Sequence, residues 1–190
     1  MFKYIVLAGA CLSISIVVVA FSKSPLKYIM RDLFSKEMPL ETVKDVDLGR
    51  YQGVWYSVYE YYAWFQAGCK CTRAEYSLAD NGKVEVKNSC YRNGALVVAT
   101  AIAWPINEGD NSKLYVQFKA PFKGKYYILS IDEGYQHALV GTPDRNYLWI
   151  LSREKTIDAN TFNEFELKAN SLGFDCSRLL DVNQECTAPD

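Results

Sequence analysis

Short segments in which apolar and polar residues alternate recur about every ten to fifteen residues between residues 51 and 153. Such alternation places the apolar side chains on one face of a β-strand. Turn residues separate the segments, and Asp80-Asn81-Gly82 is a strong hairpin signal because Asn-Gly tolerates the positive φ angles of a tight turn. We predict strands at residues 53–62, 71–79, 83–91, 95–104, 113–119, 125–132, 136–141 and 147–153. Eight antiparallel strands with short connections predict an all-β fold, an up-and-down β-barrel with a lumen.

A single helical pattern follows the strands. Asp158 is a residue type that caps helices, and Gly173 is typical of a helix end. The apolar positions between them lie on one face of the predicted helix: Phe162, Phe165, Ala169 and Leu172. An apolar face must be buried, so we expect this helix to pack on the barrel wall.

The amino-terminal residues differ from the rest of the chain. Residues 4–21 form an uncharged run of 18 residues, and we interpret residues 1–22 as a signal peptide or a membrane anchor. Cys11 lies in this run, either as a lipid-attachment cysteine or, as its spacing favours, as an ordinary residue of an apolar segment. Residues 23–41 form a basic linker with amphipathic spacing, either an interfacial helix on a membrane or a flexible spacer.

Charge and composition narrow the function classes. Lys and Arg number 21 and Asp and Glu 22, a net charge of −1 that gives no electrostatic footprint for nucleic acid. His137 is the one histidine of the chain, which argues against a histidine-based metal site or catalytic triad. We therefore expect neither a metal nor another cofactor, and no nucleic-acid partner.

Five cysteines lie beyond the amino-terminal run: Cys69, Cys71, Cys90, Cys176 and Cys186. The single residue between Cys69 and Cys71 is too short a spacing for a structural zinc site. A translocation segment followed by several cysteines instead indicates disulfides and an oxidising compartment, so we expect an exported protein. Five is an odd number, and the sequence alone leaves the pairing open.

Three motifs in order resemble those of the lipocalin family. They begin with Gly53-Val54-Trp55 at the first strand, continue with Tyr135-Gln136-His137-Ala138-Leu139-Val140, and end with Asn146-Tyr147-Leu148-Trp149-Ile150-Leu151-Ser152-Arg153. The third motif, together with residues 141–145, is especially similar to bacterial outer-membrane lipocalins, and so are residues 173–177. The resemblance covers about residues 42–182, and we assign residues 42–190 to a lipocalin domain with its helix and tail.

The resemblance also implies structural roles for several residues. In lipocalins the arginine of the third motif lies across the tryptophan of the first motif, which implies a contact of Arg153 with Trp55, next to Gly53. The cysteines resemble those of plant plastid lipocalins and apolipoprotein D relatives. This similarity implies a Cys71–Cys186 disulfide and a second bridge between Cys69 and Cys90, and it leaves Cys176 as the odd cysteine.

Strand alternation, with Trp55 taken as inward, assigns the lumen side chains. The predicted ligand-binding residues are Ser57, Tyr59, Ala74, Tyr76, Val86, Asn88, Ala101, Val116, Phe118, Tyr126 and Ile128. Small alanines opposite aromatic residues leave room for a ligand. The aromatic run that ends at Trp64 and Phe65 is expected at the open mouth, either as a loop over the cavity or as a membrane-contact patch.

The family resemblance implies a protein that binds small hydrophobic molecules. We expect a non-enzymatic carrier or store of fatty acids or lysophospholipids in the cell envelope, periplasm or outer membrane, with a role in membrane lipid maintenance. Two alternatives remain at this point. One is a lipocalin-type enzyme that acts on a bound lipophile through the thiol of Cys90 in the lumen. The other is a membrane-tethered adaptor that uses residues 22–38 as its anchor.

Overall fold

The computed structural model describes residues 39–186. The predicted signal peptide or anchor, Cys11 and nearly all of the predicted linker lie outside the described residues, as do the last four residues of the chain.

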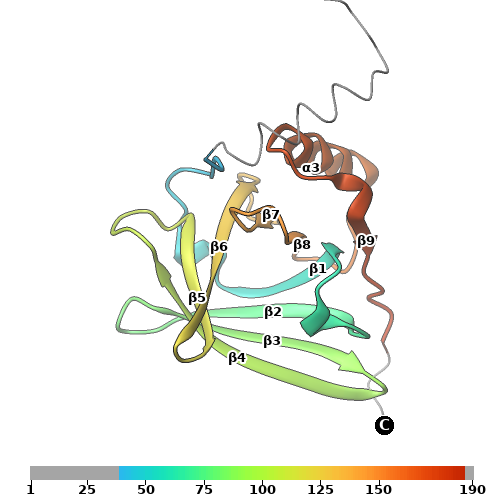
Figure 1. Cartoon of the computed structure of the whole chain (residues 1–190), viewed down its shortest axis with the longest axis horizontal. Coiled ribbons are helices and arrows are strands. Elements are labelled where there is room, and N and C mark those ends of the chain that lie inside the picture. The colour runs from blue at the N-terminus through green and yellow to red at the C-terminus, as the bar shows by residue number, and fades with distance from the viewer. Residues whose placement is uncertain (1–38, 187–190) are drawn as a thin grey trace, which may run out of the picture.

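Eight antiparallel strands form the wall of a barrel (Figure 1). Their bounds are β1 (Gly53–Tyr61), β2 (Lys70–Leu78), β3 (Val84–Arg92), β4 (Ala95–Pro105), β5 (Lys113–Lys119), β6 (Phe122–Ile131), β7 (His137–Gly141) and β8 (Leu148–Ser152). Each strand from β2 to β8 pairs with the next, β8 pairs with β1, and β1 pairs with β2 to close the barrel. The prediction of a closed eight-stranded barrel is confirmed.

The barrel has two different ends. We call the closed end the one that holds the β2–β3, β4–β5 and β6–β7 connections. The first two of these connections point to the left in Figure 1. A four-residue helix, α2 (Leu48–Tyr51), lies there, and the Asp47 carboxylate accepts hydrogen bonds from two of its backbone N–H groups. The open end holds the β3–β4, β5–β6 and β7–β8 turns and a 3₁₀ turn, η1 (Trp64–Gln66).

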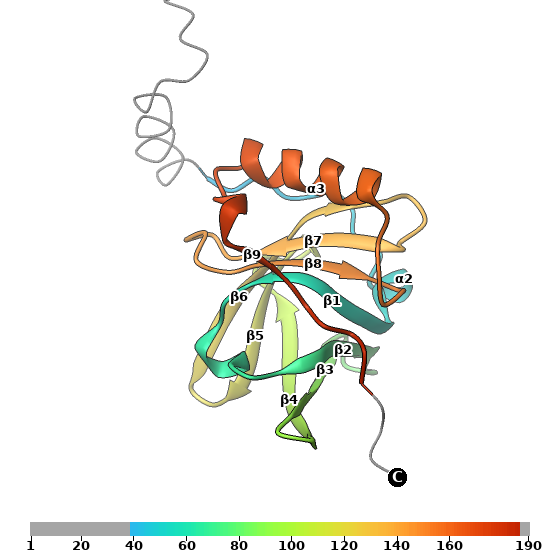
Figure 2. The same cartoon turned by 90° about the vertical axis from the view of Figure 1, so that its right-hand side faces the viewer.

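The carboxy-terminal tail forms part of the barrel wall, which the strand pattern does not predict. The β1–β2 ladder covers only residues 53–56 of β1. A ninth strand, β9 (Leu179–Asp181), pairs instead with residues 59–61. Beyond it the tail lies between the two strands, because Val182 N donates to the carbonyl of Val58 and Cys71 N donates to that of Asn183, at 3.0 and 2.8 Å. The tail therefore fills a seam between β1 and β2 (Figure 2).

The predicted helix is present as α3 (Ala159–Ser171) and is followed by a 3₁₀ turn, η2 (Cys176–Arg178). Asp158 caps it by accepting from two backbone N–H groups. Phe165 and Ala169 are buried with strand residues of β1, β7 and β8 on the outer face of the barrel. Gly141 of β7 permits this close packing, because a Cβ atom there would lie 2.7 Å from the ring of Phe174.

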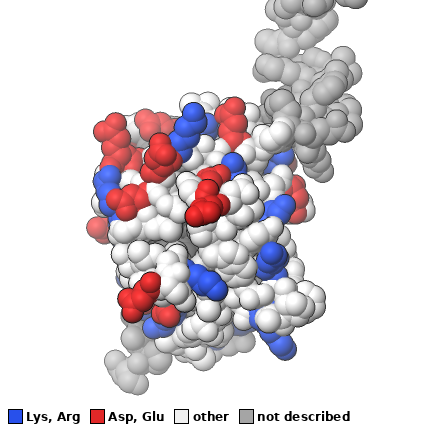
Figure 3. All heavy atoms as spheres, turned by 90° about the vertical axis from the view of Figure 1, so that its left-hand side faces the viewer, with Lys and Arg blue, Asp and Glu red and all other residues white. Residues whose placement is uncertain are grey.

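The face of the closed end carries basic and acidic side chains side by side (Figure 3). Within residues 39–186 no helix combines the length and the apolar character needed to span a membrane. The same part of the chain contains no group of three or more side chains suited to hold a metal ion.

Candidate functional site

A cavity of about 590 Å³ lies inside the barrel and opens at the open end. Its volume falls in the range of roughly 300–1,000 Å³ that is typical of ligand pockets. The predicted lumen residues that line it are Ser57, Ala74, Tyr76, Val86, Asn88, Val116, Phe118 and Tyr126. The prediction did not include several further lining residues, notably Phe65, Gln66, Thr72, Tyr147 and Trp149.

Small residues in the wall create this space. Ala74 on β2 pairs with Asn88 on β3, and both face the cavity. Gly124 on β6 pairs with Val116 on β5 and contributes no side chain, and a Cβ atom there would meet nothing within 4 Å. The small side chain of Ala74 and the absence of one at Gly124 leave unfilled space between the strands, so the interior stays hollow above the closed-end core.

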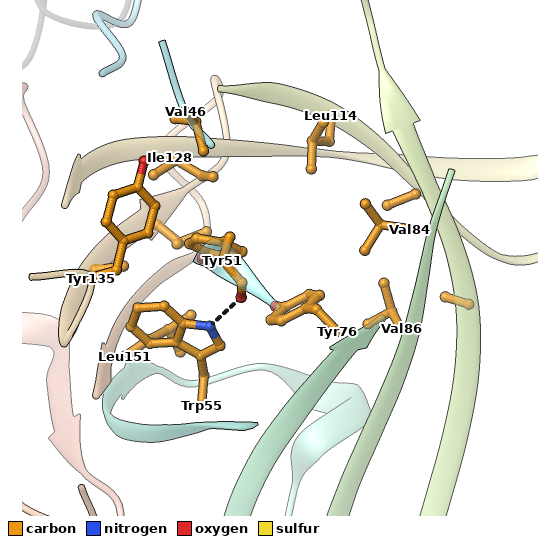
Figure 4. Close-up of a cluster of buried hydrophobic side chains, with 14 residues drawn as sticks. Val46, Tyr51, Trp55, Tyr76, Val84, Val86, Leu114, Ile128, Tyr135 and Leu151 are labelled. Atoms are coloured by element: carbon orange, nitrogen blue, oxygen red, sulfur yellow. Dashed lines mark hydrogen bonds between the residues drawn. The ribbon is translucent and has the colours of Figure 1, made fainter. Parts of the chain in front are cut away.

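The floor of the cavity is a cluster of aromatic side chains. Tyr51 from α2, Trp55 from β1 and Tyr76 from β2 lie together above the closed end (Figure 4). The ring centroids of Tyr51 and Trp55 are 4.9 Å apart, and the indole N–H of Trp55 donates to the Tyr51 carbonyl at 2.8 Å. The Tyr126 hydroxyl is hydrogen-bonded to the hydroxyls of Tyr51 and Tyr76, at 2.8 and 3.0 Å.

The side chain of Arg153 seals the closed end from outside. Its guanidinium lies 3.8 Å from the centroid of the Trp55 ring, the contact that the family resemblance implied. It also donates to the carbonyls of Val54, Arg50 and Tyr135, at 2.8, 2.9 and 3.2 Å. Gly53 has φ of +90°, a conformation that favours glycine, and a Cβ atom there would lie 3.3 Å from Arg153 Nη1. These residues support the floor and do not line the cavity.

Two polar side chains in the cavity wall have atoms without a protein partner. Thr72 Oγ1 and Asn88 Oδ1 are buried and make no hydrogen bond. Thr72 is 8% exposed, so its hydroxyl has little access to bulk solvent. Buried polar groups in proteins are normally hydrogen-bonded, so these two atoms are exceptions within the cavity wall.

The prediction that Tyr59 faces the lumen is wrong. The register between β1 and β8 shifts between Ser57 and Tyr59, which marks a β-bulge. A bulge adds one residue to a strand and reverses the alternation beyond it. Tyr59 therefore points outward, where its ring packs 4.5 Å from that of Phe162 on α3. Sequence alternation contains no signal for the bulge, because both faces of this segment are rich in aromatic residues.

The bulge places Glu60 in a position that alternation assigned to Tyr59. Ser57 Oγ donates to the Glu60 carboxylate at 2.8 Å, and Gln66 Nε2 donates to it at 3.3 Å. Gln66 in turn accepts from the indole N–H of Trp149 at 3.4 Å. This network links three cavity-lining residues to a buried carboxyl group beside them, which the sequence did not predict.

Burial raises the pKa of Glu60, while the hydrogen bonds from Ser57 and Gln66 lower it by a smaller amount. A carboxyl group whose pKa is raised by folding stabilises the fold in its protonated form, and this contribution is lost as the pH rises above the ordinary value near 4.5. We therefore expect Glu60→Gln to become progressively more stable than the natural protein as the pH rises from 4.5 towards neutrality, as measured by urea unfolding at several pH values. If the free energy of unfolding of the variant did not rise relative to that of the natural protein over this pH range, the raised pKa of Glu60 would be contradicted.

Two further predicted residues lie inside the barrel but not along the cavity. Ile128 is fully buried in the closed-end core, and Ala101 is 7% exposed in the same cluster. Neither is among the residues that line the cavity. Strand alternation correctly predicted that both side chains face the barrel interior. It does not show how far the packed core of the closed end extends along the barrel.

Both disulfides that the resemblance implied are present. Cys71 is bonded to Cys186 in the tail, and Cys69 at the end of the β1–β2 connection is bonded to Cys90 on β3. The second bond consumes the Cys90 thiol, so the enzymatic alternative loses its nucleophile. Within residues 39–186, Cys176 is the cysteine outside the two disulfides.

The aromatic residues at the open mouth divide between two environments. Phe65 lines the cavity and its ring lies 5.6 Å from that of Tyr147, as a loop folded over the opening would place it. Tyr62 and Trp64 do not line the cavity and are 64% and 74% exposed. The run thus contributes both a cavity wall and an exposed rim.

A closed antiparallel barrel with an outer helix and one hollow, largely apolar end defines a class of small-molecule-binding proteins. The chain matches the family model of the lipocalin-like domain over residues 46–184. It belongs to this lipocalin family, in which proteins generally bind small hydrophobic ligands.

Named relatives agree with this assignment. The chain is 34% identical to temperature-induced lipocalin-1 of Arabidopsis thaliana, over 82% of this chain and 89% of the relative. It is 37% identical to outer membrane lipoprotein Blc of Escherichia coli, over 75% and 81%. Apolipoprotein D of Macaca fascicularis is 28% identical, over 75% and 79%. Among solved structures, insecticyanin from the tobacco hornworm Manduca sexta has the same fold, with a TM-score of 0.66 at 23% identity over 80% of this chain and 87% of that one.

Proposed function

We propose that this lipocalin is a non-enzymatic carrier or store of fatty acids or lysophospholipids in the cell envelope, where it serves the maintenance of membrane lipids. The observation that carries the proposal is the hollow, mostly apolar cavity of about 590 Å³ with one open end. Burial of about twelve methylene groups contributes roughly 10 kcal/mol before the cost of association, which is at least about 4 kcal/mol. The remainder corresponds to a dissociation constant on the order of tens of micromolar without any specific polar contact.

The location in the envelope is supported by three observations. The two disulfides are of a kind that persists in oxidising compartments. The Blc relatives are named outer membrane lipoproteins. The uncharged amino-terminal run is compatible with export and with a membrane attachment.

Filling the cavity tests the proposal. Ala74 lies in the wall, half-buried, and Ala74→Trp would place an indole in the space that an acyl chain needs. We expect palmitate and palmitoyl-lysophosphatidylethanolamine to bind the natural protein, and their affinity to fall at least about tenfold in the variant, a loss of about 1.4 kcal/mol. Isothermal titration calorimetry measures both affinities.

Two further variants make the result interpretable. Val116→Trp fills the same cavity from β5, in case the first variant does not fold. Ala159→Trp adds the same indole at an exposed position of α3, away from the cavity, and should leave binding unchanged. Binding that survives in a folded cavity-filled variant with the affinity of the natural protein would place the ligand elsewhere and refute the proposal.

A further inference from the structure

Three tyrosine hydroxyls form a hydrogen-bonded chain at the floor of the cavity. Tyr126 is the middle member, with its oxygen 2.8 Å from that of Tyr51 and 3.0 Å from that of Tyr76. Within residues 39–186 these hydroxyls make no other hydrogen bond. The chain therefore has three protons and two hydrogen bonds, and in every arrangement one hydroxyl proton has no acceptor in the protein.

The position of the chain decides where this surplus proton points. Tyr51 is 2% exposed and does not line the cavity, whereas Tyr76 and Tyr126 do. A buried hydroxyl without an acceptor is costly, so the favoured arrangements are those in which Tyr51 donates to Tyr126. The surplus proton then lies on Tyr76 or Tyr126, the two members of the chain whose side chains line the cavity.

The floor keeps this donor throughout the physiological pH range. Burial raises the pKa of Tyr76 to about 12, and it raises the pKa values of Tyr51 and Tyr126 as well. The hydroxyls are thus neutral donors rather than phenolates. The positively charged side chains that line the cavity, Arg73 and Lys125, are exposed, and Arg153 is occupied by Trp55 and three carbonyls beneath the floor. The floor therefore offers a hydrogen bond but no counter-charge.

We propose that the floor recognises an oxygenated lipid, whose buried end carries a neutral acceptor such as a ketone, an ester carbonyl or a hydroxyl, in preference to a plain hydrocarbon end. This inference rests on the proposed carrier function and specifies its ligand. A hydrocarbon end that displaced water from the floor would leave the surplus proton unpaired, whereas a carbonyl oxygen accepts it. Sites that contain an unpaired polar group discriminate strongly against ligands that lack the matching one.

The wall above the floor holds two polar side chains with atoms that have no hydrogen-bond partner in the protein. Asn88 lies on β3 two residues beyond Val86, the partner of Tyr76, which is about 7 Å along the strand. Thr72 lies on β2 four residues from Tyr76, at about 13 Å. Their partnerless Oδ1 and Oγ1 atoms extend the polar positions from the floor towards the mouth. Thr72 Oγ1 can donate or accept a hydrogen bond, whereas Asn88 Oδ1 can only accept one, so a hydroxyl group on the ligand would be needed to satisfy Asn88.

The test compares lysophosphatidylcholines with acyl chains of ten to sixteen carbons, each with either a plain end or a terminal methyl ketone. The zwitterionic headgroup keeps the polar end at the mouth, and the series covers the unknown depth of insertion. At the chain length that reaches the floor, we expect the ketone to bind about threefold to tenfold more tightly than the plain chain, as measured by calorimetry.

Hydroxyl-deletion variants identify the source of this preference. Tyr76→Phe and Tyr126→Phe each leave one donor facing the cavity, so either single variant should retain the preference for the ketone. The double variant removes both donors, and its ketone-to-plain affinity ratio should fall to one or below while it still binds the plain chain. Tyr115→Phe removes a hydroxyl from β5 near Trp104 and Lys123, away from the cavity lining, and serves as the control.

The outcomes separate this inference from the carrier function. If the natural protein binds plain and ketone chains equally at every length, or if the double variant keeps the preference for the ketone, recognition by the floor is refuted while the carrier function stands. If neither series binds, the carrier function itself fails. Circular dichroism of each variant confirms that the barrel is folded.

Discussion

Replacement of both Cys71 and Cys186 with serine is expected to lower the free energy of unfolding by about 4 kcal/mol. The two cysteines are separated by 115 residues, so their disulfide restricts a long loop of the unfolded chain. The bond also holds the tail in the seam between β1 and β2, where the Gln184 side chain donates to the carbonyls of Ser57 and Thr72, at 2.7 and 3.1 Å. Both of those residues line the cavity, so the variant should also bind palmitate more weakly.

Urea unfolding without reductant measures this loss. Cys176→Ser is the matched control, because Cys176 takes part in neither disulfide. The control should unfold near the midpoint of the natural protein. Coincident unfolding curves for the double variant and the natural protein would show that this disulfide contributes nothing to the stability of the barrel.

Arg153→Ala is expected to lower the free energy of unfolding by about 2–4 kcal/mol. The substitution removes the contact of the guanidinium with the Trp55 ring and leaves three backbone carbonyls without their donor. Because Arg153 does not line the cavity, the order of affinities among ligands should not change.

Arg153→Lys separates charge from geometry. A lysine keeps a cation near Trp55 but cannot donate to three carbonyls in a fixed planar arrangement, so we expect a loss smaller than that of alanine but still measurable. Thermal unfolding and competition binding test both variants. A variant that melts at the natural temperature but prefers a different ligand would assign Arg153 to the binding site instead of the closed end.

The sequence predicted the barrel because its strands alternate regularly and its turns contain Gly and Asn. It also gave the correct face for most lumen residues, since a two-residue period carries that information without knowledge of the partner strand. The helix was predictable for a similar reason, because Asp158, Gly173 and a one-sided apolar stripe are local signals. The disulfides followed from family resemblance, and no local pattern fixes them.

The parts that were missed depend on contacts distant in sequence. The bulge near Val58 exchanges the roles of Tyr59 and Glu60, and it arises where β1 changes its partner from β2 to β9. The tyrosine floor combines Tyr51 from a four-residue helix with two strand residues 25 and 75 positions away, so neither its chain of hydroxyls nor its surplus proton has a local signature. The depth of the cavity likewise depends on which interior residues touch across the barrel.

The central claim is that the interior of the barrel holds the ligand. A crystal structure with a fatty acid brominated at mid-chain tests it most directly, because the anomalous signal of bromine locates the chain without reference to the protein. We predict a bromine peak inside the barrel, between Val86 and Val116. A peak confined to the outer surface, with the interior free of ligand density at saturating concentration, would contradict the claim.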